Sequence, residues 1–486
     1  MSKIKTNILY NVIYQILILI VPLITTPYVS RVLLPEGVGD YSITTAIAKY
    51  FWMFALLGMS KHGNRTIAKA KDDKKKLSVT FWNLFYFQLI ISVITLVAYI
   101  GYIYFWGYEQ FGIVIVCQIP YVVSALLEIS WFFYGTEQFK FIVTRNVIVK
   151  VLTATAVFAF VKEVDDVWIY VLINAMSLFA GQLCLWPFLR KHINFEKPNR
   201  SLIKSHFKPN CILFVSVVAV SIYTLMDKIM IEVLSNTTQL GYYENSHKII
   251  DVCCNVISAV GTVMLPRVAF LMEKDDKKTT NIYMEKSMKY IMMIVIAISF
   301  GMAGIAKEFA VIYFGKQFAS SGLIMMAMAP GIIFFSWGSI LRTQYLIPGN
   351  KDNIFVKGTV YASIVNVILN LLLINKFGAL GAAVGTVGAW AMESIYQSIK
   401  VFKELDIKKY LINLIPFVFA GMIMFIYCRI ISVLCSSLIV CICLQVIGGS
   451  MIYVLLSLLH LIIKKDELIY EYIEKFKKMK RGINHE

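Results

Sequence analysis

Residues 8–33 read ILYNVIYQILILIVPLITTPYVSRVL, an apolar run long enough to cross a lipid bilayer as a helix. The run is too long for the core of a signal peptide, and many similar runs follow it. Backbone groups in a bilayer must pair within their own segment, and the alternation of a membrane β-strand is absent. The stretch therefore predicts an all-α membrane protein that retains residues 8–33 as its first helix.

The composition agrees with this prediction. The chain has 486 residues, of which 58% are hydrophobic and 16% charged, and its mean hydropathy is +0.70. These values exclude an ordinary water-soluble protein. Because one crossing uses roughly 20 apolar residues, we predict about fourteen transmembrane helices. After residues 8–33, the apolar segments fall at 41–60, 80–105, 111–134, 146–161, 167–189, 209–234, 245–266, 288–306, 320–341, 354–374, 378–399, 410–429 and 436–463.

The basic residues predict the orientation of the chain. The net charge is +18, but Lys and Arg recur in short clusters between apolar runs, so a nucleic-acid partner is not expected. Most of these clusters fall on one side when alternate loops are assigned to it, and the positive-inside rule makes that side the cytoplasm. Both termini are then cytoplasmic. The basic stretch 464–486, interspersed with apolar residues, is expected to lie on anionic lipid as an amphipathic tail.

An internal repeat predicts the domain organisation. Residues 39–42 (GDYS) resemble 241–244 (GYYE), and residues 71–75 (KDDKK) resemble 274–278 (KDDKK). The offset is about 202 to 203 positions and spans six predicted helices, an even number, so the repeats are parallel. We predict two pseudo-symmetric six-helix bundles, 1–206 and 207–404, then two extra helices in 405–463 and the tail 464–486.

Charged residues inside apolar segments are costly and normally face water or a partner, so they mark the candidate site. Cations expected to line a central cavity and bind an anionic substrate are Arg31, Lys49, Lys228 and Lys248. Acids expected to act in gating or ion coupling are Asp227, Glu232 and Asp251. Such groups can also snorkel to the interface or form static pairs. A structural ion pair is expected between Glu128 and Lys150, at similar depth in one hairpin.

Arg65 and Arg267 end two repeat-related helices and are candidates for the cytoplasmic mouth, since guanidinium groups suit phosphate oxygens. The alternative, that both only set the topology, stays open. No phosphate-binding loop, metalloprotease motif or nucleophile elbow occurs, and the nine Cys and six His show no metal-ligand spacing. We therefore expect neither enzymatic activity nor a metal or other cofactor.

Several segments resemble a known family. Residues 26–42 (TPYVSRVLLPEGVGDYS) resemble the first-helix signature of Wzx-type polysaccharide repeat-unit flippases, in the superfamily that includes multidrug and toxin extrusion transporters. Further similar segments are 227–230 (DKIM), 240–243 (LGYY), 265–267 (LPR), 341–348 (LRTQYLIP) and 377–383 (FGALGAA). The resemblance covers roughly residues 10 to 400.

The resemblance implies rocking of two bundles around a cationic cavity that holds a sugar-diphosphate head, while the polyprenyl tail stays in lipid. The implied substrate is an undecaprenyl-diphosphate-linked oligosaccharide, flipped across a bacterial cytoplasmic membrane for capsule, O-antigen or exopolysaccharide assembly. Implied partners are membrane lipids, other polysaccharide-assembly proteins and a coupling ion, H⁺ or Na⁺. Two alternatives stay open. A drug or metabolite exporter of the same superfamily is expected to have an acidic, aromatic-lined cavity, and a membrane polysaccharide polymerase needs more room than the short outer loops give.

Overall fold

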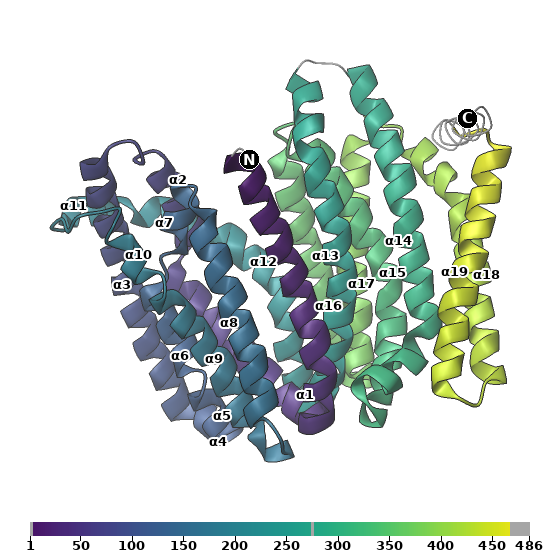
Figure 1. Cartoon of the computed structure of the whole chain (residues 1–486), viewed down its shortest axis with the longest axis horizontal. Coiled ribbons are helices and arrows are strands. Elements are labelled where there is room, and N and C mark those ends of the chain that lie inside the picture. The colour runs from purple at the N-terminus through teal and green to yellow at the C-terminus, as the bar shows by residue number, and fades with distance from the viewer. Residues whose placement is uncertain (1–2, 274–276, 467–486) are drawn as a thin grey trace, which may run out of the picture. The chain divides into compact units, whose positions relative to one another are not determined.

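The structure is a computed structural model that describes residues 3–273 and 277–466, with side chains from residue 20 onward except 216, 219, 220, 222, 223 and 259–280. Within these residues every regular element is a helix, as Figure 1 shows, so the all-α prediction is confirmed for them. In the N-terminal half the elements are α1 (Lys3–Leu56), α2 (Met59–Ala68), α3 (Lys74–Tyr102), η1 (Ile103–Gly107), α4 (Tyr108–Phe111), α5 (Ile113–Val116), α6 (Ile119–Val123), η2 (Ser124–Leu127), α7 (Ser130–Gly135), α8 (Phe139–Phe160), η3 (Val164–Asp166), α9 (Val167–Leu183), α10 (Trp186–Leu189) and α11 (Arg200–Ser205). They are followed by α12 (Phe207–Leu234), α13 (Thr237–Glu273), α14 (Lys277–Phe314), η4 (Lys316–Phe318), α15 (Ala319–Leu341), η5 (Arg342–Leu346), α16 (Asp352–Phe377), α17 (Ala379–Val401), α18 (Ile407–Leu434) and α19 (Leu438–Ile463).

Helix α1 is broken at Leu34, which separates the first two predicted segments. Leu34 has φ 59° and ψ 177°, outside the helical region. The next residue is Pro35, and proline both disfavours helical geometry in the residue before it and clashes with the preceding turn. The chain therefore makes a sharp break between residues 33 and 35 and starts a new helical stretch that runs to Leu56.

Ten stretches in the described part of the chain are long and apolar enough to cross a membrane, so the protein is a multi-pass membrane protein. The fourteen predicted segments give only ten such stretches for two reasons. The first two segments form one stretch, Ile20–Ala68, and α12, α13 and α17 are not among the ten. Helix α17 is rich in Gly and Ala, which contribute little hydropathy. Fourteen crossings with both termini in the cytoplasm stay a prediction.

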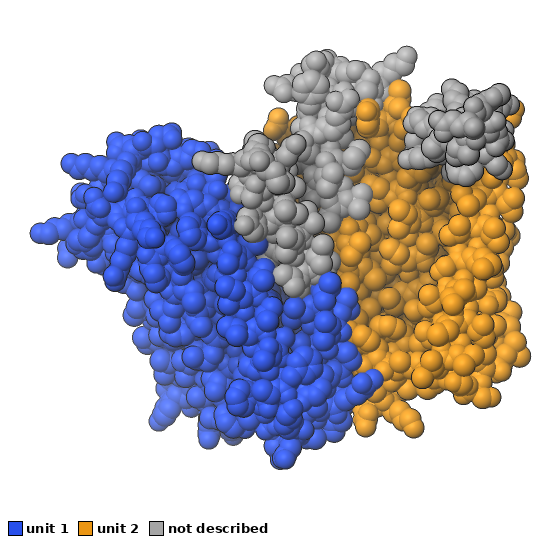
Figure 2. Space-filling model, in the orientation of Figure 1, with its two compact units in different colours: residues 1–245, 366–382 blue, residues 246–365, 383–486 orange. Residues whose placement is uncertain are grey.

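The helices divide into two compact units, coloured separately in Figure 2. Unit 1 comprises residues 1–245 and 366–382, and unit 2 comprises residues 246–365 and 383–486. Helix α12, the start of α13 and the C-terminal part of α16 thus belong with the N-terminal helices. These units cross the boundary expected at residue 206, so the two six-helix bundles stay a prediction.

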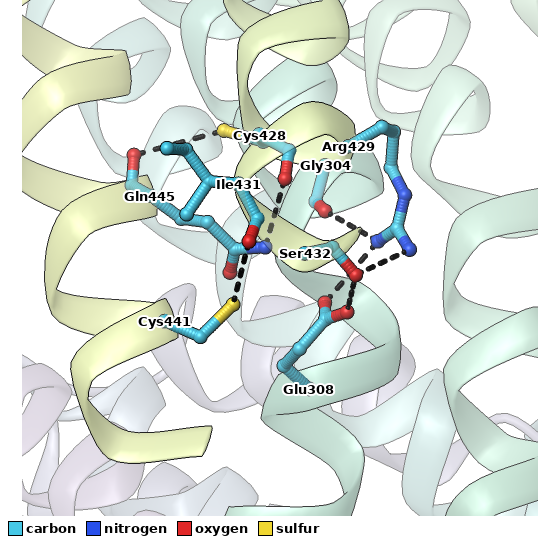
Figure 3. A network of polar contacts seen from close by, with 8 residues as sticks. All are labelled: Gly304, Glu308, Cys428, Arg429, Ile431, Ser432, Cys441 and Gln445. Atoms are coloured by element: carbon cyan, nitrogen blue, oxygen red, sulfur yellow. Dashed lines mark hydrogen bonds and ion pairs between the residues drawn. The ribbon is translucent and has the colours of Figure 1, made fainter. Parts of the chain in front are cut away.

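In unit 2 the C-terminal helices are tied to α14 by a polar network, drawn in Figure 3. The Arg429 guanidinium on α18 donates to the carbonyl oxygen of Gly304 at 2.9 Å and to Glu308 Oε2 at 3.2 Å, both on α14. Its second nitrogen donates to Ser432 Oγ at 2.9 Å, and Ser432 donates to Glu308 in turn. Gln445 Nε2 joins α19 to α18 by donating to the Cys428 carbonyl at 3.0 Å. The extra helices are therefore specifically attached to unit 2.

The chain that follows α19 is fixed to the same unit at Asp466. Its carboxylate pairs with Lys289 and accepts a hydrogen bond from the Tyr290 hydroxyl at 2.6 Å, both on α14. Residues 467–486, most of the predicted amphipathic tail, lie outside the described residues.

Candidate functional site

Unit 1 contains a polar cavity of about 550 Å³. The second part of α1, the residues around α7, and helices α8 and α9 line it. Three cations and one acid face it, so its wall is basic. Amides and aromatic rings complete the lining. Its charged residues are Lys49, Arg145, Lys150 and Glu128, and its aromatic ones are Tyr41, Trp52, Tyr121, Trp131 and Tyr134.

Arg145 is held by several hydrogen bonds. It is half-buried on α8, and its Nη1 donates to Gln182 Oε1 on α9 at 2.9 Å. Its Nε and Nη2 donate to Asn146 Oδ1 at 2.9 and 2.6 Å, and Nη1 lies 3.4 Å from Ser130 Oγ. These contacts fix the plane of the guanidinium, which is the group best suited to bidentate phosphate binding.

Sequence reasoning missed Arg145 because the residue stands immediately before the predicted segment 146–161. Helix α8 begins at Phe139, so Arg145 lies well inside the helix and not at its end. The available signal was a basic residue next to two amides, Asn146 on the same helix and Gln182 on the next one. That signal becomes visible only when the hairpin of α8 and α9 is paired.

The ion pair expected between Glu128 and Lys150 is wrong. Among the described ion pairs none joins these residues, although both line the cavity. Glu128, only 7% exposed, accepts hydrogen bonds from the Ser130 backbone N–H at 2.7 Å and from the Gln182 side-chain amide. The chain leaves helical geometry at Glu128, with ψ 111°, which turns the carboxylate toward α7 and α9. Depth along a helix predicted the level of the two residues but not this change of direction.

The aromatic residues form rigid pairs around the cavity. The Tyr41 ring packs against Tyr170 with centroids 4.6 Å apart, and Trp52 meets Tyr121 edge-on at 6.5 Å. The side chain of Trp131, which also lines the cavity, is only 2% exposed. Ring faces of this kind pack against the apolar faces of sugar rings, and the neighbouring amides can bond hydroxyl groups.

A second feature of unit 1 is a very close crossing of α1 and α13, which we call the crossing and define as residues 35–42 and 237–245. A Cβ built on Gly39 would lie 2.1 Å from the carbonyl oxygen of Thr237, and one on Gly241 would lie 1.8 Å from that of Pro35. The contacts are reciprocal, since Gly241 and Thr237 follow Gly39 and Pro35 by the repeat offset of 202 positions. Reciprocal contacts are what a two-fold axis between the repeats requires.

Polar contacts lock the crossing. Ser42 Oγ donates to Glu244 Oε2 at 2.7 Å, and these two residues are again 202 positions apart, the separation that a pseudo-two-fold axis between the predicted repeats would give. Lys228 Nζ on α12 lies 2.6 Å from the same carboxylate oxygen. Asn245 Nδ2 donates to Ser30 Oγ at 2.7 Å. Lys228, predicted for the cavity, thus lies at the crossing with Glu244, which sequence reasoning quoted in the repeat but did not select.

Asp227 is buried beside the crossing, with 2% exposed. Its carboxylate accepts hydrogen bonds from the Tyr243 hydroxyl at 2.7 Å and from Asn370 Nδ2 at 2.6 Å. Buried polar atoms without a partner lie next to it, the Asn370 Oδ1 and the Asn366 Nδ2. Such orphaned groups call for a bound water or ion. Among the described residues, no group of three His, Cys, Asp or Glu side chains is arranged to hold a metal ion.

The other predicted acids have local partners. Glu232 accepts a hydrogen bond from the Thr237 hydroxyl at 2.8 Å, which joins the end of α12 to the start of α13. In unit 2, Asp251 lies 2.9 Å from the ring nitrogen of His247, one turn earlier on α13.

The remaining predicted residues are dispersed. Lys49 lines the cavity of unit 1, and its part in substrate binding stays a prediction. Arg31 is exposed on α1, Arg65 is exposed in the last turn of α2, and Lys248 is half-buried in unit 2. The side chain of Arg267 lies outside the described residues. The structure therefore gathers Lys49, Arg145 and Lys150 in one cavity and Lys228 elsewhere.

Residues 4–272 match the model of a protein family described as Polysaccharide biosynthesis protein. The match covers more than half of the chain. The chain belongs to this family. The resemblance to Wzx-type flippases seen in residues 26–42 is therefore confirmed.

Relatives of this family member have names that refer to polysaccharide transport or biosynthesis. The chain is 23% identical over 390 residues to the "Putative O-antigen transporter" of Escherichia coli (strain K12), covering 79% of this chain and 92% of that protein. It is 22% identical over 364 residues to the "Capsular polysaccharide biosynthesis protein CapF" of Staphylococcus aureus, covering 72% and 87%. Its fold is similar to that of the lipid II flippase MurJ in an inward closed conformation, with TM-score 0.74, 15% identity, and coverage of 95% of this chain and 99% of that one.

Proposed function

We propose that this chain flips a polyprenyl-diphosphate-linked sugar repeat unit from the cytoplasmic to the outer leaflet of a bacterial cytoplasmic membrane. The observation that carries the proposal is the cavity of unit 1, where Lys49, Arg145 and Lys150 line about 550 Å³ beside aromatic rings. Cations neutralise a diphosphate, the Arg145 fork suits its oxygens, and the rings and amides suit sugars. The flipped lipid, with an undecaprenyl chain, would feed capsule, O-antigen or exopolysaccharide assembly.

The physical task of a flippase explains why these groups lie within apolar helices. The polar head must cross about 30 Å of hydrocarbon in a hydrated, charged site while its lipid chain stays in the bilayer. In alternating access the site must also close on one side at a time. We infer that the crossing is the outer gate, because the loop charges predict that residues 35–42 lie on the outer side.

We infer that Asp227 carries the coupling ion, H⁺ or Na⁺. Its buried carboxylate lies beside Tyr243 of the crossing and beside the unpartnered amide oxygen of Asn370. Neutralising this carboxylate changes the charge next to the gate. Gate position and ion binding are linked if the two gate states bind the ion with different affinity.

The transporter and flippase names among the relatives and structural neighbours favour transport over a polymerase. The basic cavity disfavours an exporter of cationic drugs, which would need an acidic cavity. Capsule, O-antigen and exopolysaccharide assembly differ in the sugar and not in the diphosphate, so the proposal is the same for all three.

The test is flipping of a fluorescent undecaprenyl-diphosphate sugar in liposomes, followed by quenching from outside. Unaltered protein should expose the label, Arg145→Gln should lower the rate at least about tenfold, and Arg145→Lys should restore it only in part because the fork is lost. Lys71→Gln is the matched control, since Lys71 makes a surface ion pair with Glu137 at 2.8 Å. Equal rates with Arg145→Gln and Lys71→Gln would remove the cavity from the mechanism. Chain elongation instead of label exposure would favour a polymerase.

A further inference from the structure

Unit 2 contains an apolar groove of about 460 Å³, which helices α14, α15, α17 and α18 line and which we call the α17–α18 groove. Trp337 and Leu414 are buried in it, whereas Ile399, Leu411 and Ile415 are exposed. Exposed apolar side chains on membrane-spanning helices face lipid chains. The groove therefore opens toward the bilayer.

The few polar atoms of the wall are already hydrogen-bonded within the protein. Ser398 Oγ donates to the Ser394 carbonyl oxygen at 2.7 Å and accepts from Trp337 Nε1 at 2.8 Å. Ser394 Oγ donates to the Ala391 carbonyl oxygen at 2.9 Å. The other residues that line the groove are apolar. The wall thus suits a hydrocarbon chain rather than a sugar or a peptide, which would need hydrogen-bond partners.

The groove is as long as one leaflet of the bilayer. Its α18 wall runs from Ile407, the first residue of the helix, to Val418, which is about 17 Å at 1.5 Å per residue. One leaflet contributes about half of the roughly 30 Å of hydrocarbon. The loop charges predict that this end of α18 lies in the cytoplasm. A phospholipid chain of the inner leaflet fits this length, whereas an undecaprenyl chain is much longer than one leaflet.

Two exposed lysines lie at the cytoplasmic end of the groove. Lys403 and Lys408 directly follow Phe402 and Ile407, which line it. Among the ion pairs of the described residues, none includes either lysine. Lysines at this level meet lipid headgroups, and each favours an anionic one.

The acids of the same turn have other contacts. Glu404 pairs with Lys351, and Asp406 Oδ1 accepts from the Lys409 backbone N–H at 3.1 Å at the start of α18. The Lys409 side chain pairs with Glu285 at 2.8 Å. The lysines beside the groove are therefore the groups that a headgroup meets.

We propose that the α17–α18 groove binds an anionic phospholipid of the cytoplasmic leaflet. Its acyl chain lies along the groove, and its phosphate lies at Lys403 and Lys408. The length, the apolar wall and the charge at one end match this class of lipid together. The site lies in unit 2 and goes beyond the proposed function, since it binds a lipid that is not flipped.

The experiment uses full-length protein in phosphatidylcholine vesicles that contain a trace of phosphatidylglycerol with a photoactivatable acyl chain. Peptide mass spectrometry then locates the crosslinks, which should concentrate in residues 394–418. Unlabelled phosphatidylglycerol should suppress them at least about tenfold more effectively than unlabelled phosphatidylethanolamine, which has no net charge.

Lys403→Gln combined with Lys408→Gln should reduce this preference to about one. Lys75→Gln combined with Lys76→Gln is the matched control, because it removes two exposed lysines from the start of α3 and should keep the preference. An unchanged preference in the first pair would overturn the role of the lysines.

A second pair of variants tests the groove itself. Ile399→Trp combined with Leu411→Trp should fill it and remove the crosslinks in residues 394–418, whereas Ile439→Trp, on an exposed face of α19, should leave them. Crosslinks spread evenly over all exposed helices would overturn the proposal and make the groove ordinary lipid-facing surface. Stronger suppression by undecaprenyl phosphate than by phosphatidylglycerol would also overturn it, because the groove would then hold the tail of the substrate. These two comparisons use unaltered protein and do not depend on how the variants fold.

Discussion

Replacing Gly241 by alanine should open the crossing. A methyl group on Gly241 would lie 1.8 Å from the carbonyl oxygen of Pro35, whereas ordinary contact begins at 3.4 Å. The obstructing atom belongs to the backbone and cannot turn aside as a flexible side chain would. The two helices must therefore separate by more than an ångström at this point, which disturbs the adjacent contact between Ser42 and Glu244.

The expected magnitude follows from the cost of overpacking, typically about 1–3 kcal/mol for added methylenes in a close-packed interior. This cost falls on the closed state alone, because the contact is absent once the helices separate. A free-energy difference of 1.4 kcal/mol changes an equilibrium tenfold, so the open population should rise by about 5-fold to 150-fold. Gly39→Ala, whose methyl group would lie 2.1 Å from the Thr237 carbonyl oxygen, should act in the same direction.

The assay is labelling of a cysteine at position 42 by a membrane-impermeant maleimide in spheroplasts, with the native cysteines replaced. Ser42 is 1% exposed, so a cysteine there should be protected in the parent protein and labelled in Gly241→Ala. The control is Gly101→Ala on α3, where an added methyl group meets nothing within 4 Å. Equal protection in the Gly241 and Gly101 variants would refute the assignment of the crossing as a gate.

Three further predictions test other parts of the molecule. Arg429→Ala should destabilise unit 2 by about 3–5 kcal/mol, because it leaves the buried Glu308 carboxylate without its cation, and an unchanged melting temperature would contradict the anchoring role. Burial and the neighbouring His62 lower the pKa of His206 to about 4 from its ordinary 6.5. The unfolded chain therefore binds a proton at this residue below pH 6.5, whereas the folded chain binds it only below about pH 4. Stability should therefore fall as the pH drops from 7 to 4, and His206→Asn should flatten that slope in thermal unfolding. Asp227→Asn should abolish the dependence of flipping on an H⁺ or Na⁺ gradient, whereas a persistent dependence would assign the ion elsewhere.

The apolar runs and the repeat were predictable from the sequence because both depend on local composition. Every chain segment that crosses a bilayer must satisfy its own backbone hydrogen bonds, so long apolar runs predict helices whatever their neighbours are. Ser42 and Glu244, which meet at the crossing, are separated by the repeat offset, but the sequence analysis did not predict their contact.

The directions of side chains were not predictable in the same way. Depth along a helix places Glu128 and Lys150 at one level, but neighbouring residues on a helix point about 100° apart, and Glu128 lies where the helix is interrupted. Lys228 likewise was expected in the cavity but pairs with Glu244 at the crossing. Such pairs depend on which helices are neighbours, and a single sequence does not contain that information.

The crossing and the cavity are joined by one rigid element, which ties gate position to substrate binding. Tyr41, Thr45, Lys49 and Trp52 lie three or four residues apart on α1 and line the cavity with one face of the helix. Ser42 stands on the same helix but points to Glu244 at the crossing. A helix without a break between residues 42 and 52 moves as one body, so separating the crossing must also move the wall that carries Lys49. We infer that opening the gate shifts a cation relative to Arg145 on α8, and thereby weakens the grip on the diphosphate at the moment when the head becomes accessible.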